Sequence, residues 1–293
     1  MVNGDDDAVR AELRPGTSAA EIVAGARAGV DGHLGGRLRA CEEMRDLALA
    51  IATSWTGRPM EPEAGVDRPI ALLFARTSGT YWGIVELLRM AFGPQAAMLT
   101  RSLFEDMVDM HFIAVNPELA IDRLPKHHEH SDMLMTDALR AHPHLLDGEP
   151  PLSGYDEQRR LELDELFGRY GHRGWSGPNI HDRVEAIAHR WLDPKERKQL
   201  DFFLGVIHRV HNQTLHVTGA SLSAVMRGAD ERGLHLSFGP GPEQVKETAF
   251  AAFWIYSQAI RMVLTRFAFP DGTLAAFEDT YLRCLQAFHQ SAE

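Results

Sequence analysis

Paired cysteines, long apolar runs and an excess of basic charge are all missing from this sequence. Cys41 and Cys284 lie at opposite ends of the chain without metal-site spacing, so we expect buried free thiols in a reducing compartment. The longest apolar run, 249–256, is far shorter than the ~20 residues of a membrane span. With 41 acidic residues against 30 basic ones, the chain has no broad basic face for duplex DNA. The acidic N-terminus does not resemble a secretory signal, and we expect a cytoplasmic protein that binds neither membranes nor duplex DNA.

Alternation typical of strands is almost absent as well, since only Leu234, Leu236 and Phe238 alternate with polar residues. Apolar residues elsewhere recur at helical intervals, which predicts an all-α multi-helix bundle of about nine or ten helices with at most one short β-hairpin. Residues 1–16 are polar and predict a frayed tail. Residues 17–293 then form a single helical domain, in which the proline-containing connection 142–155 is the place for a sub-boundary.

Capping residues and prolines mark the predicted helix boundaries. Ser18 and Glu21 have the spacing of a capping box at the start of the first helix. Apolar residues on nearly every side of 70–92 predict a helix in the middle of the bundle. The other helices are expected at 36–55, 95–115, 117–141, 156–170, 179–191, 194–216, 242–268 and 273–289.

The stretch 208–218 contains the main candidate for a catalytic site. On a helix that turns ~100° per residue, Arg209 and His216 are separated by only about 20°, and Asn212 lies about 60° away. Arginine can hold a phosphoryl oxygen while histidine moves a proton, which suits RNA cleavage without a metal. We therefore predict that Arg209 and His216 are catalytic and that Asn212 is accessory. In the alternative, Arg209 pairs with a carboxylate of the bundle and His216 caps a carbonyl near Gly219.

This Arg-x6-His spacing, with polar His211 and Asn212 inside it, resembles the catalytic motif of the HEPN superfamily. That superfamily is all-α and commonly dimeric, and many members are metal-independent ribonucleases of toxin–antitoxin and phage-defence systems. The resemblance implies catalytic roles for Arg209 and His216, RNA as the substrate, a homodimer, and an antitoxin or other protein partner. The chain departs from the motif at Val210, where many members have a polar residue.

Three further motifs resemble a bacterial family of unknown function, DUF5677, over about residues 70–265. The first runs from Arg101 to Glu105, the second is the turn that Trp175 begins, and the third is the helix end at His216. Because the family has no known activity, this resemblance implies none.

The first of these motifs also has chemistry of its own. Arg101, Glu105 and Asp109 follow one another at intervals of four, so opposite charges meet along one helix. On so apolar a helix we expect a buried core ion pair, since buried charges need partners. The functional alternative makes Arg101 and Glu105 a second layer of the site, in which Glu105 orients Arg209 or His216 from the facing helix.

Histidines and a tryptophan supply two weaker candidates. His127, His128 and His130, and the histidines of 142–144, lack the interval of four that zinc-binding helices use, so we predict a solvated face and no metal. Trp175 lies in a glycine-rich turn. In the functional alternative it stacks on a base or covers a pocket, and in the structural one it pins its loop to the bundle. No phosphate-binding loop or nucleophile elbow is present, and no cofactor is expected.

Together these patterns favour an all-α, HEPN-like protein that cleaves RNA without a metal and acts in stress or phage defence. The alternative is a non-catalytic helical protein that binds a small molecule or a protein partner and uses the same residues structurally. Position decides between the two, because catalysis requires Arg209 and His216 to share a water-accessible cleft.

Overall fold

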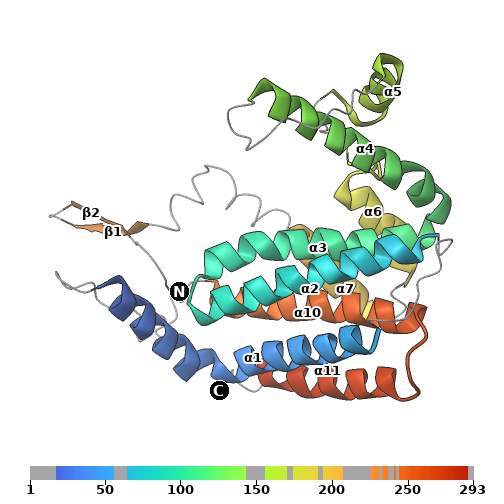
Figure 1. The fold of residues 1–293 in the computed structure, drawn as a ribbon. Coiled ribbons are helices and arrows are strands. Elements are labelled where there is room, and N and C mark those ends of the chain that lie inside the picture. Colours follow the sequence, from blue (N-terminus) through green and yellow to red (C-terminus); the bar gives the residue numbers. More distant parts are fainter. Residues whose placement is uncertain are drawn as a thin grey trace.

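The computed structural model describes residues 18–55, 65–142, 156–169, 174–190, 194–206, 226–230, 233–236, 241 and 244–289. These residues form an all-α bundle with nine α-helices and one short β-hairpin, so the predicted fold class is confirmed (Figure 1). In chain order the elements are α1 (Ala19–Trp55), α2 (Asp67–Arg89), α3 (Gly93–Val115), α4 (Pro117–Ala141), α5 (Glu157–Phe167), α6 (Ile180–Ile187) with the 3-10 turn η3 (Ala188–Arg190), α7 (Pro194–Val206), β1 (Met226–Asp230), β2 (Gly233–Leu236), α10 (Val245–Arg266) and α11 (Thr273–His289).

Helix α10 lies at the centre of the bundle. All ten residues from 251 to 260 are buried, and α10 packs against α1, α2, α3 and α11. The prediction that 70–92 would be the central helix is wrong, because α2 buries one side and leaves Leu72 and Trp82 exposed. Small alanines on several faces of α10 let neighbouring helices approach it closely.

Two tyrosines connect α1, α2 and α10. The ring of Tyr81 stacks on that of Tyr256, with centroids 4.1 Å apart. The Tyr81 hydroxyl donates to the carbonyl of Cys41 on α1, at 3.0 Å, and the Tyr256 hydroxyl donates to Oγ of Ser78 on α2, at 2.9 Å. Both hydroxyls are therefore satisfied inside an apolar core, as buried polar groups require.

The first helix starts where its cap predicts but continues further than expected. The Ser18 amide donates to Glu21 Oε2 at 2.7 Å, and the Glu21 amide donates to Ser18 Oγ at 3.3 Å, so the capping box is confirmed. We expected a second helix to begin at Gly36, whereas α1 runs unbroken from Ala19 to Trp55. Packing of this helix on α10 and α11 outweighs the ~1 kcal/mol that each interior glycine costs.

Other helix starts agree with the sequence. Pro94 lies in the first turn of α3 and Pro117 in that of α4, where a missing N–H costs nothing. The side chain of Asn179 accepts from the amides of His181 and Asp182, at 2.9 and 3.1 Å, and begins α6. The predicted strand-like stretch becomes β2, which pairs with β1 in antiparallel register. The predicted sub-boundary at 142–155 lies almost wholly outside the described residues.

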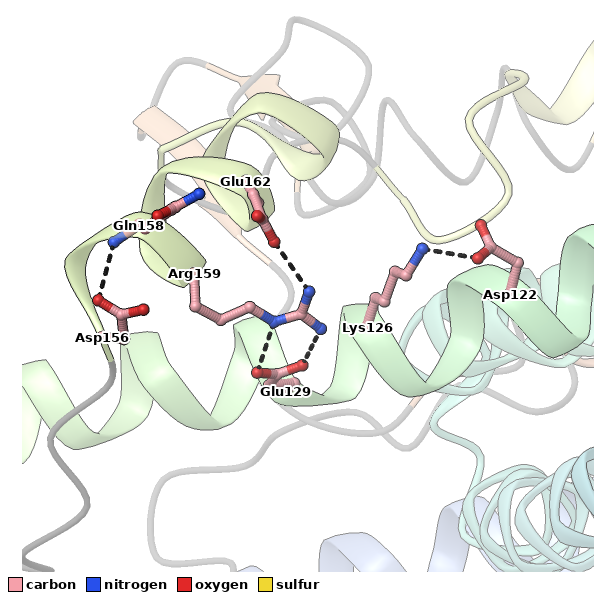
Figure 2. A network of polar contacts seen from close by, with 7 residues as sticks. All are labelled: Asp122, Lys126, Glu129, Asp156, Gln158, Arg159 and Glu162. Atoms are coloured by element: carbon pink, nitrogen blue, oxygen red, sulfur yellow. Dashed lines mark hydrogen bonds and ion pairs between the residues drawn. The ribbon is translucent and has the colours of Figure 1, made fainter.

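Helices α4 and α5 form an arm that extends away from the rest of the bundle (Figure 1). Ion pairs hold α5 onto α4: the guanidinium of Arg159 donates to both carboxylate oxygens of Glu129, at 2.9 and 2.5 Å, and to Glu162 at 3.1 Å (Figure 2). His130 is buried under α5, where its Nε2 lies 3.0 Å from Asp164 Oδ1. The predicted solvated face is therefore wrong for His130, because α5 covers it.

Among the described helices, none is long and apolar enough to cross a membrane.

Both cysteines are buried and free. Burial raises the pKa of the Cys41 thiol and that of the Cys284 thiol to about 12. Because the thiolate is the reactive form, we expect Ellman's reagent at pH 8 to label the native protein at least ~1,000-fold more slowly than the urea-unfolded chain. In urea, both thiols should react. Rapid labelling of either thiol in the native state would show that α1 and α11 separate in solution.

Candidate functional site

A polar cleft of about 450 Å³ lies between α2, α3 and the segment that leads into α6. Its charged lining comes from three separate helices, because α2 and α3 pack side by side and α6 packs against α3. The charged side chains that line it are Arg76, Glu105, Asp106, Asp109 and Arg183, and the remaining lining residues run from Gly174 to Asn179.

Two aspartates of α3 form the base of this cleft. Asp106 and Asp109 are three residues apart, which places them on one side of the helix. Asp106 is buried and accepts two hydrogen bonds from the guanidinium of Arg76 on α2, one of them 3.0 Å long. Asp109 accepts from the guanidinium of Arg183 on α6 and from Trp175 Nε1, at 3.1 Å. Each carboxylate is thus paired, as buried charges require.

Burial raises the pKa of Asp106 and that of Asp109, although their arginine partners oppose the shift. A raised pKa means that the folded state binds the proton more tightly than the unfolded chain does. The contribution of each aspartate to stability therefore declines as pH rises from the unfolded pKa, near 4, through the folded one. Keeping either carboxylate ionised therefore costs folding free energy, and carboxylates perturbed in this way are common at functional sites.

The turn over the cleft is held by Trp175 and Gly177. Trp175 is nearly buried, and its ring meets that of Phe112 edge-on with centroids 6.0 Å apart. The Gly177 amide donates to the Gly174 carbonyl at 3.1 Å, and Gly177 has φ of 80°, a conformation that favours glycine. Trp175 therefore both pins its loop to the bundle and lines the cleft, which joins two of the predicted alternatives.

We expect Gly177→Ala to lower the free energy of unfolding by about 1 to 2 kcal/mol, because an L residue is strained at this φ. A methyl group there would also lie 2.6 Å from Nη1 of Arg123, although that flexible side chain can move. Gly174→Ala is the matched control, since it has open space and an ordinary φ. Urea unfolding followed by circular dichroism measures both variants. Equal losses in the two would show that the turn conformation does not matter.

An apolar groove of about 1090 Å³ lies beside the cleft, between α2 and α4. The two spaces share Arg76, Asp109 and Trp175, so they meet at the same three side chains. The apolar walls of the groove consist of Pro69, Leu72 and Leu73 on α2 and of Ala120, Ile121, Leu124 and Pro125 on α4.

The α4 wall carries an unusual backbone group. Pro125 lies inside the helix and has no N–H to donate to the carbonyl of Ile121, four residues earlier. Both residues line the groove. The helix therefore leaves one carbonyl without its usual helical donor beside an otherwise apolar wall.

The predicted catalytic residues Arg209, Asn212 and His216 all lie in 207–225, outside the described residues. Arg101 and Glu105 do form the predicted pair, with Nε 3.0 Å from Oε1, but their side chains are 24% and 36% exposed. The expectation of a buried core ion pair is therefore wrong at these two positions. The pair lies at the solvent boundary of α3, whereas the buried charges of this helix are the neighbouring aspartates.

Sequence reasoning missed Arg76, Asp106 and Arg183. Each is a single charged residue in a helical pattern, with its partner 30 or 74 residues away, so no local spacing connects them. The sequence spacing puts Asp109 in line with Arg101 and Glu105, whereas in the structure Asp109 pairs with Arg183. Burial of the α3 surface under α6 could have been inferred only from the packing of the two helices.

The histidines do not assemble into a metal site within the described part of the chain, which holds no group of three or more histidine, cysteine or acidic side chains suited to an ion. His127 and His130 share a face, as their spacing predicts, and both rings contact Phe167 at centroid distances of 5.1 and 5.6 Å. Burial lowers the pKa of His127, and the positive charge of nearby groups lowers it further. Both effects favour the neutral form of the His127 imidazole.

The fold and the cleft define a class of protein: an all-α bundle with a projecting two-helix arm and a polar cleft that opens into an apolar groove. The chain belongs to DUF5677, a family of unknown function, whose model matches residues 67–233. The predicted resemblance to this family is thus confirmed. The matched span includes α2, α3, α4 and α6, the helices that line the cleft and the groove. No curated protein and no solved structure matches the chain.

Proposed function

We propose that this protein binds a small amphipathic molecule in the joined cleft and groove. The observation that carries the proposal is their adjacency: a polar space and a larger apolar space share Arg76, Asp109 and Trp175 in their linings. Small-molecule sites are typically concave spaces of about 300 to 1,000 Å³, mostly apolar, with a few converging polar groups. Buried carboxylates with raised pKa values at one end fit the same description.

The pairing of the charges favours binding over catalysis at this site. Asp106 and Asp109 each accept hydrogen bonds from an arginine, which leaves neither carboxylate free to act as a base without breaking an ion pair. Trp175 uses its only donor on Asp109. The arrangement thus supports a rigid, preformed recess that recognises a ligand by shape and polarity.

Nile red, a neutral apolar dye whose emission changes on binding, tests the proposal. We expect saturable binding to the full chain and about tenfold weaker binding by Leu72→Gln, because the groove wall loses apolar contact. Leu282→Gln is the matched control, since Leu282 is 55% exposed and Leu72 is 62% exposed, but Leu282 lies on α11 and lines neither space. Equal weakening in both variants, or no binding by the wild type, would overturn the proposal.

We propose metal-independent RNA cleavage as a second function, with Arg209 and His216 catalytic and Asn212 accessory. The Arg-x6-His spacing supports it, since it supplies a cation for phosphate and a group that moves a proton. Arg101 and Glu105 would then orient these residues. Roles in stress or phage defence follow from the HEPN resemblance alone.

The test is cleavage of single-stranded RNA in EDTA by the wild type, by His216→Ala and by His33→Ala. His33 is an exposed histidine on α1 and controls for loss of a surface imidazole. Cleavage that is lost only in His216→Ala supports the enzyme. No cleavage by the wild type, or equal cleavage by all three proteins, contradicts it.

We also propose a homodimer, supported by two large apolar side chains that are exposed on the arm outside the groove, Met135 and Leu161. Light scattering after size-exclusion chromatography gives the mass directly, and a mass near the 32.7 kDa of one chain would contradict the dimer. The cytoplasmic location and an antitoxin or other protein partner stay predictions.

A further inference from the structure

We infer that the ligand of the groove is an anionic amphiphile, whose apolar body lies between α2 and α4 and whose negative group meets Arg68. This inference rests on the proposed binding function and adds the charge of the ligand. It follows from an accounting of the charged side chains that line the two spaces.

Each carboxylate in the lining already has a cation. Glu105 pairs with Arg101, and Asp106 and Asp109 pair with arginines from α2 and α6. A cationic ligand would therefore have to displace an arginine, and at Asp109 it would have to break an ion pair that is largely buried on both sides. The acidic residues of the cleft thus offer no site for a positive group.

Arg68 is different, because it is an exposed cation of the groove with no ion pair to any described residue. The carboxylate beside it in the chain, Asp67, is taken by Arg266 of α10, at 2.7 Å from Nε. Among the described residues, none therefore compensates the charge of Arg68 at the edge of this apolar space. An anion there would gain an attraction that no carboxylate of the lining supplies.

Arg76 adds donors of the same kind further along the groove. Its side chain is 63% exposed, and two of its five N–H groups point to Asp106, which leaves three for other acceptors. Arg68 and Arg76 are eight residues apart on α2, or about 12 Å along the helix axis. Leu72 lies between them on the same helix and lines the same groove.

The described part of the lining carries a net positive charge. Among the described residues, the charged ones of the groove are Arg68 and Arg76 against Asp109, and Asp109 is hydrogen-bonded to Arg183 and to Trp175. The remaining polar lining is His127 and His128, which carry no negative charge. The apolar walls exclude water from the body of a ligand, so a single negative group at one end is the simplest complement to this surface.

The test compares three probes with the same ten-carbon chain: decanoate, 1-decanol and decylammonium, each below its aggregation concentration and each displacing Nile red from the full-length chain. We expect decanoate to bind about tenfold tighter than decanol, and decylammonium to bind more weakly than decanol. Added salt should weaken decanoate binding and leave decanol binding unchanged, because the ion contact is exposed.

Arg68→Gln should remove the preference for decanoate while leaving decanol affinity within twofold of the wild type. Arg27→Gln, which removes an exposed arginine of α1 that lines neither space, is the matched control and should change nothing. Equal affinities for decanoate and decanol, or a preference for decylammonium, would overturn the charge assignment while the binding function stands. Failure of Nile red and of all three probes to bind would overturn both.

Discussion

Asp109→Ala is expected to lower the free energy of unfolding by about 3 to 5 kcal/mol. The substitution removes the acceptor of two buried donors, the guanidinium of Arg183 and Nε1 of Trp175. An arginine left unpaired in a largely buried position keeps its desolvation cost without the compensating attraction. Urea unfolding monitored by circular dichroism measures the loss directly.

Two companion variants make the result specific. Glu105→Ala removes another carboxylate of the same helix, but its partner Arg101 is partly exposed, so the loss should stay below about 1 kcal/mol. Asp109→Asn keeps an acceptor for Trp175 and removes the charge. Its loss of unfolding free energy should therefore fall between those of Asp109→Ala and Glu105→Ala. A loss under about 1 kcal/mol for Asp109→Ala would mean that water screens the cluster and that the cleft is more open than described.

Phe253→Ala should lower the free energy of unfolding by about 3 to 5 kcal/mol, as large-to-small substitutions in a fully packed core do. Phe253 is completely buried in α10, where its ring is parallel to that of Tyr281, with centroids 5.6 Å apart, and contacts Phe288 at 5.0 Å. These contacts hold α11 against the central helix. Chemical denaturation should therefore show a lower midpoint with an unchanged slope.

Phe202→Ala is the matched control for this prediction. It removes the same side chain from α7, but Phe202 is 57% exposed, so the change should stay within about 0.5 kcal/mol. Losses of similar size in the two variants would mean that α10 is not the central helix of the bundle in solution.

The predictions that succeeded depend on residues close together in the chain. The Ser18–Glu21 box, the Asn179 cap and the Arg101–Glu105 pair each join groups within four residues, and each forms as its spacing indicates. Helix periodicity is local in the same sense, so the all-α class follows from it. A cap or an i,i+4 pair needs only a helix, and it forms wherever that helix lies.

The predictions that failed concern burial. Residues 70–92 look apolar on nearly every side, yet α2 exposes Leu72 at the groove, while α10 takes the central place. His130 belongs to a polar, histidine-rich stretch, yet α5 covers it and Asp164 binds it. Composition indicates how much apolar surface a helix has, but the neighbours that cover it decide which part is buried.

By itself, the sequence determined that this protein is helical and where most of its helices begin. Its motifs also indicated the family to which the chain belongs. Only the tertiary structure decided which charges meet. Arg76 and Arg183 reach the aspartates of α3 from helices far away in the chain, and the cleft and groove exist because α2, α4 and α6 pack around that helix. The physical reason is range: caps and periodicity act over a few residues, whereas a buried ion pair forms only after packing has removed water from both partners.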